Sequence, residues 1–561
     1  MGLSSILNTG TRALMAAQIG MDVTGQNISN ADVEGYSRKR LNQAADYRYD
    51  STFGQMGFGV TVINIERQRD QYIDLQIQRQ NQQLGFYQQV DYVLERVENI
   101  FTEPSNSGLL RFIDQFFDSW QNLTNNPADL SARTMVKTNA EILTNVFGNI
   151  AGELNDLKNS LNSDLEDRVR KVNQLAHAIY NINQEIATVE VNNQHANDSR
   201  DRRDVLVKEL ATLVDIQTNE NQFGQISIST GGSLLVSPVF VQTVETTTSS
   251  YRQSDGSTLV SIGLRFAQSR RDFRPTAGEL AGIMDARDRV VPQFQRELDT
   301  LAVELATQIN DQHRQGYNLL GYSGLYFFDP SLTGASDIAL SASILSNVQN
   351  IAAASGGAAQ AAANNTFAAG TLDFGLPAVA LTTNNILPAT PANMARNIVA
   401  GTVVVNASGT LLTEGTDYHI DYVRGTIQML HGGYTGEPVS VDFEYRTGSF
   451  KGPGDNTNAL AIARLRSTLT MVPDTVGNKT STFAEYYSSF IGRLGLNRTE
   501  ATSNVETRRY LIEQFNTHQD AIAGVSLDEE MANLIRFQHA FTAAARLIGT
   551  ASQMMDVLFN M

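Results

Sequence analysis

The chain has 561 residues, of which 42% are hydrophobic and 18% charged, so it can form three or four packed domains of about 150 residues each. Its 42 Lys and Arg residues against 59 Asp and Glu residues give a formal net charge of −17, which disfavours nucleic acid or an anionic membrane as the main partner. Cysteine is absent, which excludes disulfides and thiolate metal sites.

The first residues do not have the pattern of a secretory signal sequence. Arg12 interrupts an amphipathic stretch, and no long apolar core precedes a small-residue cleavage site. No run of about 18 apolar residues occurs anywhere, so membrane insertion is not expected. A chain of this kind leaves the cell, if it does, by a route that needs no such signal, and its acidity favours solubility before assembly.

Residues 3–29 are predicted to form an amphipathic helix with an apolar seam that repeats every seven residues. One series is Leu7, Leu14, Met21 and Ile28, and the other is Leu3, Gly10, Ala17 and Thr24. From these we take Leu3, Leu7, Leu14, Ala17, Met21 and Ile28 as self-assembly residues. The apolar side is thin, so this helix is expected to be marginal alone in water.

Residues 31–65 are polar and rich in turn signals, with a short β-like run at 60–65. A second helix is predicted from about 70 to 101. Another follows with a dense aromatic face that is typical of core packing: Phe112, Ile113, Phe116, Phe117 and Trp120. Residues 130–213 lack proline and predict one or two very long helices, with a break near 192–198.

The apolar period changes to two between residues 215 and 273, which predicts a small β domain. Gly231-Gly232 and Asp255-Gly256 are its hairpin turn signals. Helix is predicted again from 276 to about 314. Residues 353–370, rich in Ala, Gly and Asn, are expected to be a linker or exposed loop. A second β segment spans about 375–450, and helical patterns return at 458 and from 482 to the end.

The last helix carries a second seam with the same seven-residue spacing. Its two interleaved series are Leu534, Phe541, Ile548 and Met555, and Phe537, Ala544, Ala551 and Leu558. Small residues in both terminal seams would let two helices approach closely. A seam at each extreme predicts that the ends pair with each other or with neighbouring copies, as in an assembly subunit.

The predicted fold class is a multidomain, mainly α protein with inserted all-β domains, in which terminal helices form a coiled-coil-like inner domain beside a long helical rod and two outer β segments. The predicted domains are an N-terminal axial helix and turn region that pairs with the C-terminus (1–65), the first part of the rod (66–214), a small β domain (215–275), the return of the rod (276–340), an inserted β domain with its linker (341–457), the last part of the rod (458–525) and a C-terminal axial helix (526–561).

The sequence lacks the common catalytic and ligand-binding motifs, which favours a protein that is not an enzyme. The seven histidines are scattered, and the phosphate-binding, dinucleotide-binding and serine-hydrolase motifs are absent. Asp285, Arg287, Asp288 and Arg289 are interpreted as a solvated face or as inter-domain salt bridges. Three adjacent carboxylates, Asp528 to Glu530, suit a helix N-terminus better than a metal site. No catalytic residue, cofactor or metal site is therefore expected.

Two terminal motifs resemble those of the bacterial flagellar rod, hook and hook-associated proteins. The first is Asn27-Ile-Ser-Asn-Ala-Asp-Val-Glu-Gly-Tyr-Ser-Arg38, and the second is Leu527-Asp-Glu-Glu-Met-Ala-Asn-Leu-Ile-Arg-Phe-Gln538 followed by Thr550-Ala-Ser-Gln-Met-Met-Asp-Val-Leu558. The long helical stretch 130–213 and the segments 278–288 and 455–460 make the first hook-associated protein family the most similar. The motif residues carried over are Asn27, Ser29, Asn30, Gly35, Tyr36 and Ser37.

The resemblance implies a structural subunit of the flagellum that connects hook to filament and assembles through its terminal helices after type III export. It implies an extracellular location after a transient cytoplasmic stage. The implied partners are further copies of this chain in a helical array, the hook protein, a second junction protein next to the filament, and an export chaperone on the C-terminal helix. Two alternatives stay open: a surface adhesin that uses the inserted β domain, and another axial member of hook or rod type.

Overall fold

The computed structural model describes residues 3–51, 54–101, 108–191, 194–252, 258–355, 359–369, 371–372, 376–381, 398–399, 401–422, 425–446, 451–473 and 477–559. The fold is mainly helical with several small antiparallel sheets. It divides into two compact units, the first formed by Met1–Val93, Asn159–Arg289 and Arg498–Met561 and the second by Leu94–Lys158 and Val290–Asn497. The chain passes from one unit to the other within the helices α2 (Gln71–Phe101), α4 (Leu130–Glu190) and α10 (Phe483–Ala523), and between Arg289 and Val290 of the π-helical turn η1 (Ala286–Val290).

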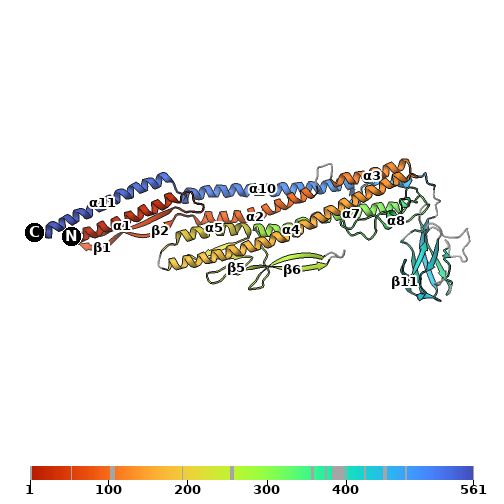
Figure 1. The fold of residues 1–561 in the computed structure, drawn as a ribbon, viewed down its shortest axis with the longest axis horizontal. Coiled ribbons are helices and arrows are strands. Elements are labelled where there is room, and N and C mark those ends of the chain that lie inside the picture. The colour runs from red at the N-terminus through yellow and green to blue at the C-terminus, as the bar shows by residue number, and fades with distance from the viewer. Residues whose placement is uncertain are drawn as a thin grey trace. The chain divides into compact units, whose positions relative to one another are not determined.

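The first unit contains both ends of the chain (Figure 1). Besides its parts of the three shared helices, it holds α1 (Leu3–Ser29), β1 (Lys39–Ser51), β2 (Gly54–Arg67), α5 (Asn197–Leu213), β3 (Gln217–Glu220), β4 (Ile226–Thr230), β5 (Ser233–Val236), β6 (Val244–Arg252), β7 (Thr258–Phe266), α6 (Gly278–Asp285) and α11 (Leu527–Phe559). The helices predicted at 3–29 and 70–101 are confirmed, as is the break in the long helical stretch, since α4 ends at Glu190 and α5 begins at Asn197.

Residues 39–67 differ from the predicted polar turn region, because they form an antiparallel hairpin of β1 and β2. The register of this hairpin shifts at three places, and most of its described side chains are partly exposed. Both faces of an exposed, bulged ribbon contact solvent, so apolar and polar residues do not alternate regularly along its strands. The sequence therefore shows the two-residue alternation of a strand only at 60–65. The predicted β domain is present as β3–β4–β5 and the β6–β7 ribbon, and the Gly231-Gly232 turn joins β4 to β5. Asp255-Gly256 lies outside the described residues.

The interpretation of the charged residues 285–289 as a solvated face is wrong for Arg287, which is buried. A π-helical turn, η1 (Ala286–Val290), interrupts the helix predicted at 276–314 and turns Arg287 inward. The buried guanidinium of Arg287 donates to Asn162 Oδ1 at 3.0 Å and to the carbonyl oxygen of Ile262 at 2.6 Å. Arg289 stays exposed and pairs with Asp285 one turn earlier, as expected for the surface of a helix.

The second unit contains a helical core and a β module. Its further elements are α3 (Leu109–Asn125), α7 (Val291–His313), α8 (Ala342–Ser346), η2 (Val348–Asn350), β8 (Ala359–Phe367), β9 (Val379–Ala380), β10 (Val404–Ala407), β11 (Thr410–Leu412), β12 (Tyr418–Asp421), β13 (Thr426–Met429), η3 (Gly432–Tyr434), β14 (Val439–Arg446), α9 (Thr457–Arg464), η4 (Leu465–Ser467), β15 (Met471–Pro473) and β16 (Lys479–Ser481). The aromatic face predicted on α3 is buried at Phe116, Phe117 and Trp120, which confirms its role in the core.

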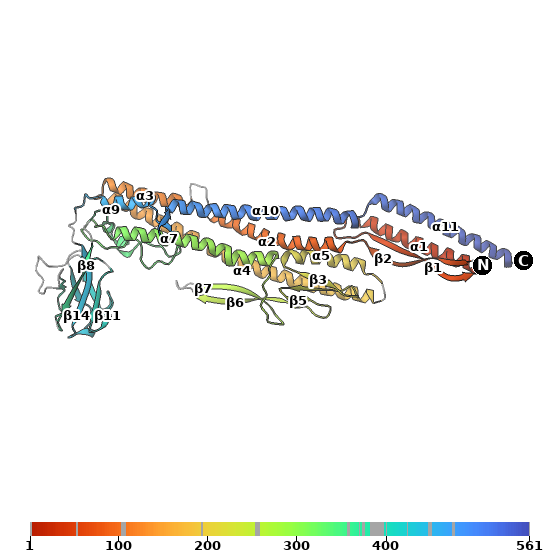
Figure 2. The same cartoon turned by 180° about the vertical axis from the view of Figure 1, so that it is seen from behind.

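The β module combines a sheet of order β11-β10-β14-β8 with a sheet of order β12-β13-β9 (Figure 2). Both sheets contribute to one buried apolar cluster, which includes Phe367, Ile398, Ile427 and Phe443 and is drawn entirely from residues 367–443. The expected linker at 353–370 is wrong over β8, which pairs with β14. Alanine and asparagine have low strand propensity, so tertiary pairing overrides local preference here. The predicted domain boundaries as a whole stay predictions.

The core around α3 and α7 holds a histidine in a defined neutral form. His313 is fully buried, its Nδ1 donates to the carbonyl oxygen of Leu325 at 2.7 Å, and its Nε2 accepts from the backbone N–H of Ala352 at 2.8 Å. Burial, and the positive charge of the equally buried Arg133, lower the pKa of His313 from 6.5 to about 4. The Trp120 ring lies 6.3 Å from the imidazole, centroid to centroid.

We expect the second unit to lose stability in acid through His313. The folded pKa lies below the unfolded value, so the contribution of His313 is complete above about pH 6.5 and is lost as the pH falls to about 4, at up to about 1.4 kcal/mol per pH unit. Trp120 is the chain's one tryptophan, so its fluorescence reports denaturant unfolding of this core directly. His313→Gln should flatten the pH dependence between pH 4 and 6.5, whereas substitution of the exposed His177 by Gln should leave it unchanged. An equal slope in all three proteins would contradict the expectation.

Candidate functional site

The two ends of the chain meet as an antiparallel pair of helices, α1 and α11, with N and C at the same end in both views (Figures 1 and 2). Three positions establish the pairing. A Cβ placed on Gly10 would lie 2.7 Å from Ile548 Cγ1, and one placed on Gly20 would lie 2.6 Å from Phe537 Cδ1. The Asn27 amide nitrogen donates to Glu530 Oε2 at 3.0 Å. Of the two alternatives, the structure shows the ends pairing with each other within one chain.

The predicted seam residues lie along this pair. Ala17, Ala544 and Ala551 are buried, whereas partial burial is found for Leu7, Leu14, Met21, Ile28, Leu534, Phe537, Phe541, Ile548 and Met555. Leu3 and Leu558 belong to the helices, but their side chains lie outside the described part of the chain. The role of these residues in self-assembly stays a prediction. Gly20 was missed by the sequence analysis, although it contacts Phe537 directly.

Glycine is required where the two helices approach most closely. At Gly10 and Gly20 any side chain would overlap atoms of Ile548 and Phe537, so the two backbones can come together only because these positions have no Cβ. This use of glycine weakens α1 by about 1 kcal/mol per residue relative to alanine. The pair therefore depends on close packing rather than on the intrinsic stability of either helix.

The hairpin β1–β2 packs on α1 as well, so α1 lies against both the hairpin and α11. Arg12 forms an ion pair of 2.6 Å with Asp46 of β1, and a Cβ on Gly59 of β2 would lie 3.1 Å from Thr9 Cγ2. Ala16 and Val23 of α1 are buried at 3% and 5% exposure. The marginal helix predicted from the sequence is thus covered along two sides.

The motif residue Asn27 is a buried polar hub at the end of α1. Its Oδ1 accepts from the Tyr36 hydroxyl at 2.8 Å and from the backbone N–H of Lys39 at 3.0 Å. Its amide nitrogen donates to the Lys39 carbonyl oxygen at 2.9 Å, in addition to Glu530. Burial, followed by the charges of Asp198, Asp201 and Glu530, raises the pKa of Tyr36, which keeps its hydroxyl protonated as a donor.

The other motif residues shape the turn between α1 and β1. Ser29 Oγ and the Asn30 side chain donate to the carbonyl oxygen of Gln26 at 3.1 and 2.9 Å. Gly35 has a φ of 81°, and a Cβ there would lie 2.3 Å from Val205 Cγ2 of α5. Both the left-handed backbone and the close approach therefore require glycine at this position.

The first turn of α11 is held by the residue that follows the motif turn. Arg38 contacts Glu530 Oε1 through NH2 at 2.7 Å and Glu529 Oε2 through NH1 at 2.8 Å, and its backbone N–H donates to the Ala523 carbonyl oxygen at 2.9 Å. Glu530 is 2% exposed, whereas the side chain of Glu529 is 63% exposed. Of the three adjacent carboxylates that suited a helix N-terminus better than a metal site, Glu529 and Glu530 bind Arg38, and Glu530 also binds Asn27.

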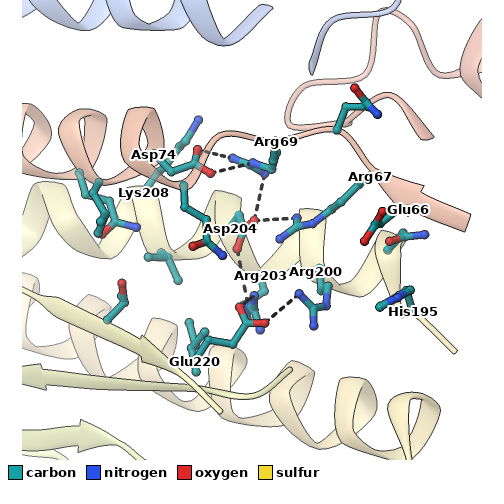
Figure 3. A pocket seen from close by; sticks show the side chains of 18 of the residues that line it. Glu66, Arg67, Arg69, Asp74, His195, Arg200, Arg203, Asp204, Lys208 and Glu220 are labelled. Carbon is teal, nitrogen blue, oxygen red and sulfur yellow. Dashed lines mark hydrogen bonds and ion pairs between the residues drawn. The ribbon is translucent and has the colours of Figure 1, made fainter. Parts of the chain in front are cut away.

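A network of ion pairs connects the motif turn and β2 to α5. Ser37 Oγ donates to Asp201 Oδ1 at 2.8 Å, and Lys39 pairs with Asp198 at 2.5 Å. Arg67 NH1 lies 2.9 Å from Asp201 and 2.7 Å from Asp204. Figure 3 shows Arg67 and Arg69 converging on Asp204. The network connects three segments that are far apart in the sequence, residues 37–39, 67–69 and 198–204, so the sequence alone could not show that they come together.

A cavity of about 570 Å³ lies beside this network and is lined by charged side chains (Figure 3). Each of its four arginines has a carboxylate neighbour: Arg67 and Arg69 have Asp204, and Arg200 and Arg203 have Glu220. Burial alone would raise the pKa of Asp204, yet the surrounding arginines hold it below its ordinary value. These charges neutralise one another, which fits a structural joint rather than a site for an ionic ligand.

Two further findings bear on the kind of site. Within the described ranges, no three histidine, aspartate or glutamate side chains gather closely enough to hold a metal ion. Among the same residues, no helix combines the length and hydrophobicity that crossing a bilayer requires.

Family models match three parts of the chain. Residues 94–328 match the flagellar hook-associated protein FlgK helical domain. Residues 521–561 match the C-terminal region of the flagellar basal body rod FlgEFG proteins, and residues 7–36 match the flagella basal body rod protein. The two rod-type matches cover the paired terminal helices and part of the motif turn.

Relatives and a solved structure agree with these matches. Flagellar hook-associated protein 1 of Bacillus subtilis is 26% identical, with 99% of this chain and 97% of the relative covered. The proteins of the same name from Salmonella typhimurium and Escherichia coli are 25% and 26% identical over the full length of both chains. The structure of the flagellar hook junction protein FlgK from Burkholderia pseudomallei has a TM-score of 0.56 at 18% identity, covers 80% of this chain and all of that one, and supports the fold.

The terminal helix pair and its matches define the class as a structural component of the bacterial flagellum, which is not an enzyme. Within this class, the chain belongs to the flagellar hook-associated protein 1 family.

We expect an added methyl group at Gly20 to separate the terminal helices. Gly20→Ala would push a Cβ into the Phe537 ring and cost about 1–3 kcal/mol, so backbone amides of α11 should exchange with deuterium roughly five- to 150-fold faster. Gly25→Ala is the matched control, since no atom lies within 4 Å of its added Cβ and the change should favour the helix. Equal exchange in the two variants would show that the seam is not closely packed at Gly20.

Proposed function

We propose that the chain is a structural subunit of the junction between the hook and the filament of the bacterial flagellum. The observation that carries the proposal is the pairing of α1 with α11, which joins the two extremes of the chain in a narrow seam. The matches of both helices to rod-type axial families, and of 94–328 to a hook-associated helical domain, support it.

Contact with further copies of the chain is supported by apolar side chains of α11 outside the seam. Leu527, Met531 and Ile535 follow one another at four-residue spacing and are 51%, 50% and 54% exposed. Met554 and Val557, three residues apart, are 53% and 60% exposed. An exposed apolar strip on a helix is typical of a contact surface, and head-to-tail contacts between identical subunits produce open helical arrays.

The proposal includes export in an unfolded state through the flagellar type III apparatus, after a transient stage in the cytoplasm. Each terminal helix alone is weakly apolar, and no cysteine is present to crosslink the chain on the way. The helices then pair once both ends have emerged. An export chaperone on α11 would cover its exposed apolar side chains before this step. The hook protein and a second junction protein next to the filament complete the proposed set of partners.

We expect Met531→Ser combined with Ile535→Ser to block assembly without unfolding the chain. Both side chains are about half exposed, so the free chain loses little, whereas each would bury apolar area worth roughly 1.5 kcal/mol against a neighbour. Cells that lack the chain would be supplied with the variant, and swimming and its presence in isolated flagella would be measured. Gln538→Ser combined with His539→Ser, at exposed polar positions of α11, is the control. Normal swimming with the first variant would contradict the proposal.

A surface-binding role of the β module is a second candidate, because the module has an apolar core made of its own residues. Excision of residues 359–446 should therefore leave both the helical core and the terminal pair folded. Under the junction proposal, we expect cells with the excised chain to swim, since the helices carry assembly. Loss of surface or host attachment with swimming retained would favour the adhesin. Loss of swimming would assign the module to the junction itself.

A further inference from the structure

The apolar seam between α1 and α11 does not by itself define how far one helix is shifted along the other. Both seams repeat every seven residues, so a slide of seven residues, about 10 Å along the axis, brings apolar or small residues opposite one another again. In one direction, Ala544 would replace Phe537 opposite Gly20, and Met555 would replace Ile548 opposite Gly10. Something other than apolar periodicity has to select the observed pairing.

Polar residues occupy one position of each repeat. Glu530 stands seven residues before Phe537 and therefore continues the series Phe537, Ala544 and Ala551. Asn27 stands seven residues after Gly20 in the same way. These two residues face each other at 3.0 Å and are 2% and 1% exposed. The series that contains Gly20 thus ends in Asn27, the series that contains Phe537 begins with Glu530, and the other residues of both series are apolar or small.

We propose that Glu530, bound by Asn27 and Arg38, sets the register of the two terminal helices. A carboxylate buried this completely needs hydrogen-bond donors, and the observed register supplies the Asn27 amide and the Arg38 guanidinium. A buried polar residue in an apolar seam is a known means of selecting one register among several.

Both slides by one repeat break this cluster. In one direction Asn27 comes to lie against the Phe537 ring, and Glu530 passes beyond the end of α1. In the other direction Glu530 moves to a position opposite Gly20, between the two helices. On that side of α1 the buried residues are Ala17 and Thr24, and the Thr24 hydroxyl already donates to the Gly20 carbonyl oxygen at 2.8 Å. Glu530 would therefore find no hydrogen-bond donor there. Each slide therefore buries an unsatisfied polar group.

The link of three residues between α10 and α11, 524–526, is the competing explanation, since it also limits movement of α11. The two explanations differ in what the Glu530 side chain does. If the link sets the register, removing the carboxylate leaves the pairing unchanged. If Glu530 sets it, an apolar residue at this position extends the seam by one repeat and makes the slid pairings accessible.

Disulfide trapping tests the proposal on the purified, monomeric full chain, whose lack of cysteine removes any background. Gly10→Cys is combined with Ile548→Cys, which reports the observed register, or with Phe541→Cys or Met555→Cys, which report the two slid pairings. The last two pairs also carry Ile548→Ala, because a side chain at residue 10 would otherwise overlap Ile548 in the observed register. Each pair is placed in the wild-type, E530L, E530Q and E529L backgrounds. Crosslinks formed under mild oxidation are quantified by peptide mass spectrometry.

In the wild-type background we expect the 10–548 crosslink to exceed each of the other two at least tenfold. E530L should reduce this ratio to about twofold or less. E529L, at the neighbouring exposed position, and E530Q, which keeps an acceptor for Arg38, should retain it. An unchanged ratio in E530L would overturn the proposal in favour of the link. Loss of the 10–548 crosslink in E530L without an increase in the 10–541 or 10–555 crosslink would also overturn the proposal. Glu530 would then stabilise the pairing of the two helices without selecting their register.

The register proposal concerns the pairing of two helices within one chain, so it does not depend on the proposed junction function. Only the consequence of the register for the assembled flagellum rests on that function. A failed trapping experiment with normal incorporation of wild-type chain would leave the junction function intact. Conversely, a chain that traps in one register but is absent from isolated flagella would contradict the function and not the register.

Discussion

The pairing of α1 with α11 is the constraint on which the first unit depends. It joins residues more than 500 positions apart, as the Asn27–Glu530 hydrogen bond shows. The seam is narrow because Gly10, Gly20, Ala544 and Ala551 remove side-chain bulk between the helix axes, so the backbones approach closely and gain dispersion contacts along their length. Because an isolated helix with a thin apolar side is expected to be marginal in water, we expect each terminal helix to depend on packing against the other.

The polar cluster at the base of the pair connects the seam to the rest of the unit. Arg38 binds Glu530 of α11, Ser37 binds Asp201 of α5, and Arg67 joins β2 to the same aspartate. The motif turn thus contacts α11 and α5 through two adjacent residues, and β2 reaches the same aspartate of α5. This explains in physical terms why the motif combines an asparagine, a glycine and a serine: each position has a hydrogen bond or a backbone conformation that few other residues provide.

The regular helices and the terminal seams were predictable because a period of 3.5 or 3.6 residues is visible in a single sequence. Strands β1 and β8 were not, since their pairing depends on partners elsewhere in the fold and their composition disfavours strands, and β2 was predicted only over its β-like run at 60–65. In the candidate site, the sequence identified the seam residues and the motif residues. It did not indicate that Glu530, Arg38 and Asp201 take part in the polar contacts of the site. Charged residues at a helix start have an ordinary interpretation, and only the fold shows that Glu530 is buried against Asn27.

The distribution of apolar residues separates the two roles of α11. Its seam faces α1 and contains small and half-buried side chains, which suit a close pairing within one chain. Leu527, Met531 and Ile535 lie outside that seam, with about half of each side chain exposed. If α11 served only to close the chain, polar residues at these positions would cost nothing. The apolar side chains found at these positions therefore support the proposal that α11 uses a second face, outside the seam, to contact another molecule.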